Sequence, residues 1–511
     1  MGNSSCIFPG AGQQVSRTPQ LSFRRSGRGG RVESNRPPER LSRAVSQGSR
    51  PVTQTEWSGR PYTRKNFKEP TDRTGPGLDV QRREARMHVV VVGAGLLGLS
   101  TAHALDQDGH EVSLVEAGDG PGLETSFANS GMLSPSLTDP WNAPGIFFKM
   151  FRWLGREDAP FLLRLRAVPS LIGWGARFFW QSGRQRYEKN WISNLRLGLY
   201  SMEVLNDLVT EHKLPFARGY TGILKVFRNR EELSAGLKQA DFLARQEIET
   251  RVLDASELVE LEPALSGAAH ALEGAIHHPI DGHGDAYLFC RALERVLGKA
   301  GVQFHYGLQA RGFSRDGQRI AAVETDRGPI EGEAFVLAAG SHSVELAATM
   351  GVRIPVRPAK GYSITLDLKD GCEHPQIPVV DDSLHVALTP LGEKLRVAGT
   401  AEFTGYDKGL TKGRIQNLLD VLGRIYPHCA EQAQSEAVAP WCGHRPMSAD
   451  GVPILGATSV SNLFLNTGHG PLGWTLASGS GRLVSDLIGG KTPNLPLEPY
   501  SVARFRSYWP F

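Results

Sequence analysis

A buried strand that runs into a glycine-rich turn constrains this chain more than any other feature of its sequence. Residues 88–92 read HVVVV, an apolar and mainly β-branched run that is typical of a parallel strand covered on both faces. Residues 93–98 read GAGLLG, which matches GxGxxG, and a helical pattern follows over residues 97–108. A second apolar run at residues 111–115 ends in Glu116. This order predicts a βαβ unit that binds a dinucleotide.

Each glycine of the turn has a separate physical task. Gly93 permits the tight turn, Gly95 lets the backbone approach a pyrophosphate, and Gly98 lets the helix and the strand pack closely. The helix start then offers N–H groups and a partial positive charge to the phosphates. Glu116 is placed to accept a hydrogen bond from a ribose 2′-hydroxyl and disfavours a 2′-phosphate, so that NADP is not expected. The residues predicted to form this part of the site are Val89, Val90, Val91, Val92, Gly93, Ala94, Gly95, Leu96, Leu97, Gly98 and Glu116.

The residues after Glu116 favour FAD over NAD. Residues 123–132 read LETSFANSGM, and their hydroxyl and amide groups suit the lining of an extended cofactor. An ordinary surface loop is the competing interpretation of this segment. The residues predicted to contact the cofactor here are Ser126, Asn129, Ser130, Gly131 and Met132.

The charge of the chain is divided unevenly. Residues 1–86 carry 17 of the 57 Lys and Arg residues and 7 of the 53 Asp and Glu residues, a net charge of +10, whereas residues 87–511 carry −6. The first part is rich in Ser, Gly, Pro and Gln, so we predict a disordered basic extension. Two interpretations of it remain open: a true start of translation at Met87, and an organellar presequence. The acidic remainder does not favour binding to nucleic acid.

Two other classes of protein receive no support. No apolar run approaches the ~18 residues that a membrane-spanning helix needs. The five cysteines are widely spaced and show no Cys/His metal spacing, so no metal site is predicted. His277, His278 and His283 lack the acid and histidine spacing of a metal site on a helix, and residues 279–285 are interpreted as a turn before a helix over residues 286–299.

Several longer motifs resemble one family. The motifs are LETSFANSGMLSP at residues 123–135, KGYSIT at 360–365, GHRPM at 443–447, DGVP at 450–453 and NTGHGPLGWT at 466–475. In this order they are similar to segments of the small subunit of the bacterial D-amino acid dehydrogenases. These enzymes are FAD flavoproteins of the D-amino-acid-oxidase/glycine-oxidase superfamily. The resemblance covers residues 87 to about 505.

The resemblance implies an α/β fold in which a Rossmann-like FAD-binding domain is interleaved with an α+β substrate domain built on an antiparallel sheet. The predicted FAD-binding parts are residues 87–139, 274–351 and 439–511. The predicted substrate parts are residues 140–273 and 352–438. The FAD is expected to be non-covalent, because Ala128 stands where some relatives attach the flavin through a histidine.

The later motifs are consistent with one end of a flavin site. Residues 463–465 form a short apolar strand, and the following Gly-His-Gly opens a helix whose start favours the negative charge of a reduced flavin. An ordinary glycine-rich turn is the alternative. In the family, the strand at residues 334–338 packs against the cofactor. The contacts predicted from these segments are Gly340, Gly468, Gly470, Leu472 and Gly473.

Three residues are the candidates for substrate contact. The GHRPM motif makes Arg445 the candidate for a bidentate pair with an amino acid carboxylate. Tyr362 is a candidate hydroxyl partner for the same carboxylate, and His469 is a candidate contact of the flavin or the substrate. For Tyr362 and His469, packing or structural roles stay open.

The resemblance implies FAD-dependent oxidative deamination of D-amino acids to 2-oxo acids and ammonia. The electrons would pass to a quinone or another acceptor that is not NAD. Two alternatives stay open: an oxidase of glycine, sarcosine or D-proline that uses O2, and a non-catalytic FAD-binding assembly factor. Residues 147–190 are rich in aromatic residues with basic residues interspersed, so we hypothesise a cytoplasmic enzyme with peripheral contact to the inner membrane. A helical core of the substrate domain is the competing interpretation.

Overall fold

The computed structural model describes residues 86–508, apart from residues 154–158, 160, 369–373 and 436–437. The chain divides into two units, Met1–Pro70 and Thr71–Phe511, and all of the described residues belong to the second. The extension predicted for residues 1–86 therefore lies outside the described residues, except for Arg86.

A six-stranded sheet carries the glycine-rich turn. Its strand order is β19-β20-β13-β1-β2-β9, and only β19 runs antiparallel to its neighbour. The strands are β1 (His88–Val92), β2 (Glu111–Val115), β9 (Gln303–His305), β13 (Ala334–Leu337), β19 (Ile454–Ala457) and β20 (Leu463–Thr467). Because the parallel strands end at one edge, the turns that follow β1, β13 and β20 gather there.

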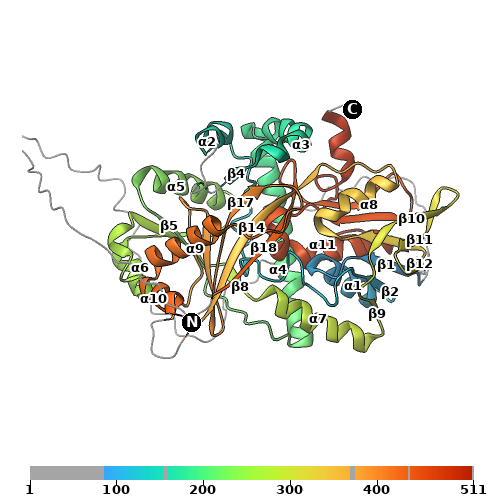
Figure 1. Cartoon of the computed structure of the whole chain (residues 1–511), viewed down its shortest axis with the longest axis horizontal. Helices are drawn as coiled ribbons and strands as arrows, with labels where there is room; N and C mark the ends of the chain where they lie inside the picture. The colour runs from blue at the N-terminus through green and yellow to red at the C-terminus, as the bar shows by residue number, and fades with distance from the viewer. Residues whose placement is uncertain (1–85, 154–158, 160, 369–373, 436–437, 509–511) are drawn as a thin grey trace, which may run out of the picture. The chain divides into compact units, whose positions relative to one another are not determined.

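Both faces of this sheet are covered, as the valine run predicts. Val89 and Val91 pack into a cluster with α1 (Leu96–Gln107), α7 (Ala286–Ala300) and α11 (Gly473–Ile488). Figure 1 shows α1 and α11 beside β1 and β2. Val90 and Val92 pack on the other face. That face is covered by α8 (Ser343–Thr349) and by a small sheet of β10 (Ala310–Asp316), β11 (Arg319–Thr325) and β12 (Gly328–Glu331).

A nine-stranded sheet forms the second half. Its order is β18-β14-β17-β16-β15-β5-β7-β6, and β4 adds to β17. Its pairs are antiparallel except β15 with β5 and β4 with β17. The strands are β4 (Phe161–Leu163), β5 (Ile223–Phe227), β6 (Arg251–Leu253), β7 (Gly274–His278), β14 (Val356–Asp367), β15 (Val379–Asp381), β16 (Val386–Leu391), β17 (Lys394–Phe403) and β18 (Ala439–Ser448).

Different helices cover the two faces of this larger sheet. One face packs against α6 (Ala255–Leu261), α9 (Lys412–Ile425) and α10 (Pro427–Ser435). The other face meets Trp174 and Phe178 of α3 (Val168–Gln181). The remaining elements are α2 (Ile146–Trp153), α4 (Arg184–His212), α5 (Arg230–Ala244) and the two-stranded pair β3 (Met132–Leu133) and β8 (Gly282–His283). The predicted combination of a Rossmann-like sheet with a largely antiparallel one is confirmed.

The predicted domain boundaries differ from the observed topology at three places. β7 and β18 belong to the larger sheet, because they pair with β5 and β14, whereas residues 274–351 and 439–511 were predicted to be FAD-binding parts. Helix α4 lies in predicted substrate residues, yet its apolar side packs into the cluster of α1 and α11. The spacing of apolar residues indicates that a segment forms a buried strand. It does not indicate which of the two sheets that strand joins.

A buried polar group ties the turn after β7 to the loop after β3. The backbone N–H of Ser136 donates to Asp281 Oδ1 at 3.0 Å, and its hydroxyl donates to Oδ2 at 2.6 Å. The same hydroxyl oxygen lies 2.9 Å from His278 Nδ1. Burial raises the pKa of Asp281 to about 7 and lowers the pKa of His278 to about 3. His278 is therefore neutral at pH values where Asp281 gains or loses its proton.

Asp281 makes the stability of the fold depend on pH. The unfolded chain releases this proton near the ordinary value of 3.8, but the folded chain keeps it up to about pH 7. Folding therefore becomes less favourable as pH rises to about 7, by at most about 1.4 kcal/mol per pH unit, and then levels off. We expect Asp281→Asn to remove this pH-dependent loss of stability. The difference in melting temperature between the variant and the wild type should therefore increase, in favour of the variant, from pH 5 to pH 7. A gain that does not change across this range would contradict the assignment.

Candidate active site

The turn between β1 and α1 has the geometry of a phosphate-binding loop. Gly93 has φ of +108°, and a Cβ on Gly98 would lie 1.7 Å from the carbonyl oxygen of Gly93, so that neither position admits a side chain. Helix α1 begins after Gly95 without a side-chain cap and without an acidic residue in its first turn. Its N-terminus therefore presents backbone donors and a partial positive charge to an anion.

Glu116 fixes this loop from the end of β2. One carboxylate oxygen accepts from the N–H of Ala94 at 2.8 Å, and the other accepts from the N–H of Gly118 at 2.8 Å. A carboxylate has about four lone-pair sites, so capacity for a hydroxyl donor remains. The predicted ribose contact of Glu116 is compatible with this position.

The four predicted valine contacts have a supporting role. The side chains of Val89, Val90, Val91 and Val92 are buried in the two apolar clusters that sandwich β1. Ala94, Leu96 and Leu97 are buried as well. These buried residues fix the position of the turn between β1 and α1. The backbone of that turn, and not these side chains, is placed to contact phosphates.

Residues 123–132 lie between the two sheets. Ser126 Oγ accepts from the N–H of Leu96 at 3.2 Å, which joins the segment to the start of α1. The Asn129 side chain accepts from the N–H of Gly131 at 2.9 Å, and its carbonyl accepts from Arg396 at 2.9 Å. Gly131 has φ of +74°, and β3 begins at the next residue, Met132. Ser130, between them, is half-buried.

This segment is also bound to the larger sheet. The hydroxyl of Ser363 on β14 donates to the carbonyl of Ala128 at 2.7 Å. The hydroxyl of Thr125 donates to the carbonyl of His444 on β18 at 2.8 Å. The segment thus connects the phosphate loop with the two strands that carry the candidate substrate residues.

The turns after β13 and β20 complete the same edge. Thr467 at the end of β20 donates its hydroxyl to the carbonyl of Gly340 at 2.9 Å, after β13. Gly468 and Gly470 have φ of +79° and +55°. A short 3₁₀ turn, Gly470–Leu472, leads into α11, which begins at Gly473. Residues 468–473 also fit GxGxxG, so a glycine-rich turn precedes a helix twice in this fold.

The edge retains polar groups without partners. Among the described residues, the buried hydroxyls of Ser341 and Ser343 have no hydrogen-bond partner. Buried polar groups are normally satisfied, so these hydroxyls indicate room for a polar ligand beside β13. Together with the start of α1, where Gly95 provides no side-chain cap, and with the glycine turns, they fit an extended dinucleotide cofactor.

Arg445 lies on β18 in a cradle of neutral groups. Its Nη1 donates to the carbonyl of Thr400 at 2.9 Å, and its guanidinium lies 5.7 Å from the centre of the Trp141 ring. A Cβ on Gly361 would come within 2.2 Å of Nη1, so the guanidinium occupies the space above that glycine. No carboxylate pairs with Arg445 among the described residues.

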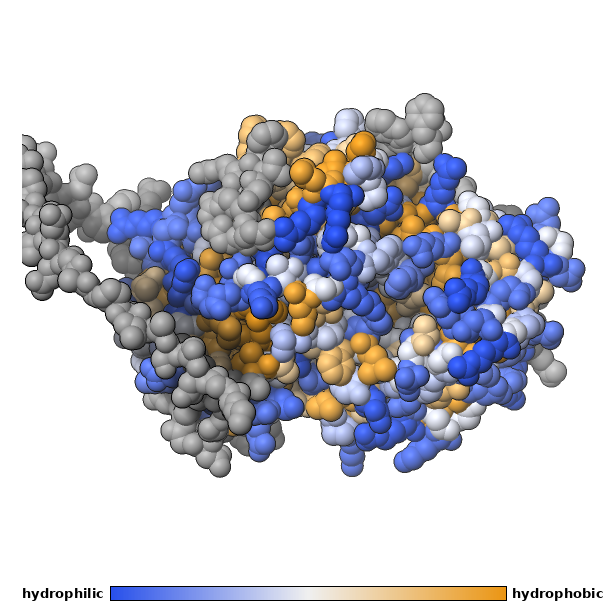
Figure 2. Space-filling model, viewed as in Figure 1, coloured by the Kyte–Doolittle hydropathy of each residue, from blue (hydrophilic) through white to orange (hydrophobic). Residues whose placement is uncertain are grey.

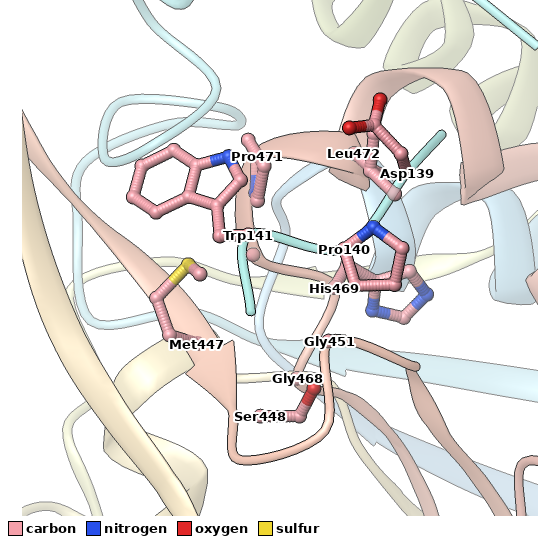
Figure 3. Close-up of a pocket in the computed structure, with 11 residues that line it drawn as sticks. Asp139, Pro140, Trp141, Met447, Ser448, Gly451, Gly468, His469, Pro471 and Leu472 are labelled. Carbon is pink, nitrogen blue, oxygen red and sulfur yellow. The ribbon is translucent and has the colours of Figure 1, made fainter. Parts of the chain in front are cut away.

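Burial lowers the pKa of Arg445 to about 10, so the guanidinium is charged at neutral pH. Trp141, which lies beside Arg445, and Met447, two residues after it on β18, also lie close to the start of α11. Both line a small pocket with Asp139, Pro140, Ser448, Gly451 and residues 468–472. Figure 3 shows the Trp141 indole and the Met447 thioether on one side of this pocket.

The structure does not bring Tyr362 to Arg445. In the ladder between β14 and β18, Gly361 pairs with Gly443 and Tyr362 pairs with Cys442. Side chains alternate along a strand, so Tyr362 lies on the opposite face of the sheet from Arg445. Its hydroxyl donates to Glu402 and lies 3.1 Å from the Thr411 hydroxyl. The predicted role of Tyr362 as a second carboxylate ligand is therefore not supported by the register.

His469 is directed into α11. Its Nε2 lies 2.9 Å from the hydroxyl of Ser480, and the side chain is buried. Burial lowers the pKa of His469 to about 3, so the imidazole is neutral. The structural role that the sequence left open for this histidine is the one that its contacts favour.

Sequence reasoning missed three residues that shape the site. They are Gly361, which the guanidinium approaches, Thr400, which accepts from it, and Arg396, which holds Asn129. The KGYSIT motif contains Gly361 and was a usable signal. Thr400 and Arg396 lie on β17, outside every motif, and only the pairing of β17 with β14 brings them to the site.

The fold and the site fit a protein that binds a dinucleotide, and comparison with known proteins specifies its class. The DAO family, described as FAD dependent oxidoreductase, matches residues 88–487. The D-amino acid dehydrogenase of Paramagnetospirillum magneticum is 40% identical over 423 residues, which cover 83% of this chain and 100% of that protein. That of Granulibacter bethesdensis is 38% identical over 419 residues, 82% of this chain and 100% of that protein.

Two solved structures share the fold at low sequence identity. Glycine oxidase from Geobacillus kaustophilus has a TM-score of 0.66 and 24% identity, and covers 82% of this chain and 99% of its own. L-proline dehydrogenase from P. horikoshii has a TM-score of 0.65 and 20% identity, with coverage of 83% and 98%. This chain belongs to the DAO family of FAD-dependent oxidoreductases, which confirms the predicted family and cofactor.

We expect Glu116→Ala to weaken FAD binding. The change removes the acceptor that holds the N–H groups of Ala94 and Gly118, and hydrogen bonds to a charged group contribute about 1.5–3 kcal/mol. The dissociation constant of FAD should rise about 10- to 100-fold, measured by flavin fluorescence on titration of apoprotein. Glu111→Ala is the matched control, because Glu111 is an exposed residue at the other end of the same strand. Equal affinities for the two variants would contradict this role of Glu116.

Proposed function

We propose that this chain oxidises D-amino acids to imino acids, which water then converts to 2-oxo acids and ammonia. The observation that carries the proposal is the half-buried guanidinium of Arg445, which has no acidic partner among the described residues. A partly buried charge without a counter-ion is unfavourable, so its retention is consistent with a ligand that supplies the carboxylate. The two relatives described above are named D-amino acid dehydrogenases.

Arg445 has the donor geometry that a carboxylate requires. One of its nitrogens is fixed by the Thr400 carbonyl, and the remaining N–H donors are available for a bidentate pair. The ring of Trp141 and the backbone of Gly361 hold the guanidinium plane in place. A substrate anchored here is oriented by its head group, which is how positioning lowers a barrier.

FAD supplies the redox chemistry when it is bound, as acceptor of the hydride from the substrate Cα. The side chains named around Arg445 (Trp141, Met447, Thr400) are neutral. The substrate amine is therefore expected to enter uncharged, after losing its proton to water. We expect the FAD to be held without a covalent bond, since Ala128 offers no group for attachment.

Two other functions are weighed against this one. An O2-using oxidase of glycine, sarcosine or D-proline would use the same carboxylate anchor, and the fold is shared with glycine oxidase. A non-catalytic FAD-binding protein would have no use for an unpaired guanidinium in this cradle. We propose a quinone as the electron acceptor, and rapid mixing of reduced enzyme with O2 or a soluble quinone compares the two acceptors directly.

Arg445→Met should abolish most substrate binding. The loss of a buried charge pair costs about 3 kcal/mol or more, so we expect kcat/KM for D-alanine to fall at least about 100-fold, with FAD content unchanged. Arg445→Lys keeps the charge but loses the bidentate fork, so kcat/KM for D-alanine should fall less, by about 10-fold. The measurement is anaerobic bleaching of the flavin by D-alanine, with L-alanine as the negative substrate.

Arg184→Met is the control, since Arg184 is an exposed residue of α4 whose guanidinium pairs with Glu188. Bleaching of Arg445→Met at the wild-type rate would refute the role of Arg445. A wild-type protein that retains FAD but is not bleached by any of a panel of D-amino acids would favour the non-catalytic alternative.

We further propose that α2 and α3 contact the surface of a membrane. Figure 2 shows hydrophobic residues gathered where Figure 1 places these helices. Large apolar side chains are exposed there, namely Phe147, Phe148, Leu165, Ile172 and Trp180. The guanidinium of Arg186 lies 4.5 Å from the Trp180 ring, and Arg184 and Lys189 are exposed nearby on α4. Aromatic side chains flanked by cations are typical of contact with anionic lipids.

In the part of the chain that the structure describes, no helix has the length and apolar content needed to span a bilayer. The expected contact is therefore interfacial. We expect the full chain to sediment with phosphatidylglycerol vesicles more than with phosphatidylcholine vesicles. The double variant Phe148→Ser, Trp180→Ser should reduce the bound fraction about 10-fold or more, because each ring loses roughly 1.5–3 kcal/mol of apolar burial. Leu288→Ser, an exposed apolar residue of α7, is the control, and equal binding of both variants would contradict the proposal.

A further inference from the structure

The pairing of β17 with β14 is irregular opposite Gly361, the glycine that the Arg445 guanidinium approaches. In its ladder with β14, Glu402 pairs with Lys360 and Gly399 pairs with Tyr362. Two residues of β17, Thr400 and Ala401, therefore face the single residue Gly361 of β14. This two-to-one arrangement is a β-bulge in β17. Bulges are frequent beside active sites, where they change the direction of a backbone group.

The bulge holds Thr400 in an unfavourable conformation. Thr400 has φ of +55°, in the left-handed region that β-branched residues rarely adopt. Glycine would adopt this conformation without strain, yet a threonine stands here. Strained residues of this kind persist where the surrounding contacts determine them, and they are frequent at ligand sites.

The strained residue contributes two polar groups to the Arg445 cradle. Its carbonyl accepts from Arg445 Nη1 at 2.9 Å, whereas a regular strand would direct that carbonyl along the ladder. Its hydroxyl is buried, with the residue 6% exposed, and has no hydrogen-bond partner among the described residues. A buried hydroxyl without a partner is uncommon in a native fold and needs an explanation.

We propose that Thr400 is a positioning and specificity residue for the carboxylate that Arg445 binds. Its carbonyl fixes one side of the guanidinium, and its hydroxyl donates a hydrogen bond to the same carboxylate. Gly361 completes the arrangement, because any side chain there would displace the guanidinium. This inference rests on the proposed function, since it names a further contact of the same substrate site.

The test separates the hydroxyl from the shape of the residue. Thr400→Val keeps the branched shape and removes the hydroxyl, whereas Thr400→Ser keeps the hydroxyl. We expect Thr400→Val to raise KM for D-alanine about 10-fold or more, while the rate of flavin reduction at saturating substrate changes much less. Thr400→Ser should remain within about threefold of wild type in both constants. Binding of acetate, followed by the flavin spectrum, should weaken in parallel with KM for Thr400→Val alone.

Thr400→Gly provides an independent arm if the valine variant does not fold. It relieves the strain, so we expect a higher melting temperature than wild type together with the raised KM. Gly361→Ala should lose acetate binding, whereas the control Gly413→Ala, a helical position with open space around it, should keep it. A valine variant with wild-type KM and wild-type acetate affinity would overturn this proposal. If the wild-type protein itself is not bleached by D-amino acids, the proposed function fails instead.

Discussion

The site depends on the close approach of the Arg445 guanidinium to the backbone of Gly361. A guanidinium can lie there only because Gly361 has no side chain. Among the described residues, its neighbours are a carbonyl and an indole ring, and no carboxylate pairs with it. Removing a charge from water without a counter-ion is unfavourable, so this arrangement must be held by the rest of the fold. The antiparallel ladder of β14 and β18 supplies that rigidity over ten paired positions.

The cofactor half and the substrate half are joined by hydrogen bonds to one segment. Residues 123–132 connect to α1 through Ser126, to β14 through the carbonyl of Ala128, and to β18 through Thr125. Arg396 of β17 also holds the carbonyl of Asn129. The distance between the phosphate loop and Arg445 is therefore set by hydrogen bonds between side chains and backbone groups. Sequence changes in this segment are expected to affect cofactor and substrate together.

The sequence was most informative where chemistry and local structure coincide. The strand, the GxGxxG turn and Glu116 lie next to one another along the chain, and their period and glycine pattern predicted the Rossmann-like unit. Arg445 was found through its motif. Tyr362 was not placed correctly, because a motif gives the residue but not the face of the strand, and a shift of one residue reverses that face. For a related reason the sequence did not indicate that β7 and β18 join the larger sheet: strand pairing is non-local.

By itself, the sequence determined the nucleotide-binding unit, the family and the identity of the candidate carboxylate anchor. These follow from local patterns and from motifs that are continuous along the chain. Only the tertiary structure decided that Arg445 has no acidic partner among the described residues and that Tyr362 lies on the opposite face of the sheet from it. The structure also decided that His469 contacts Ser480 of α11, and that a strained Thr400 meets Arg445 from β17. Those facts arise from the register between strands and from burial. Both depend on contacts between residues that are far apart in the sequence.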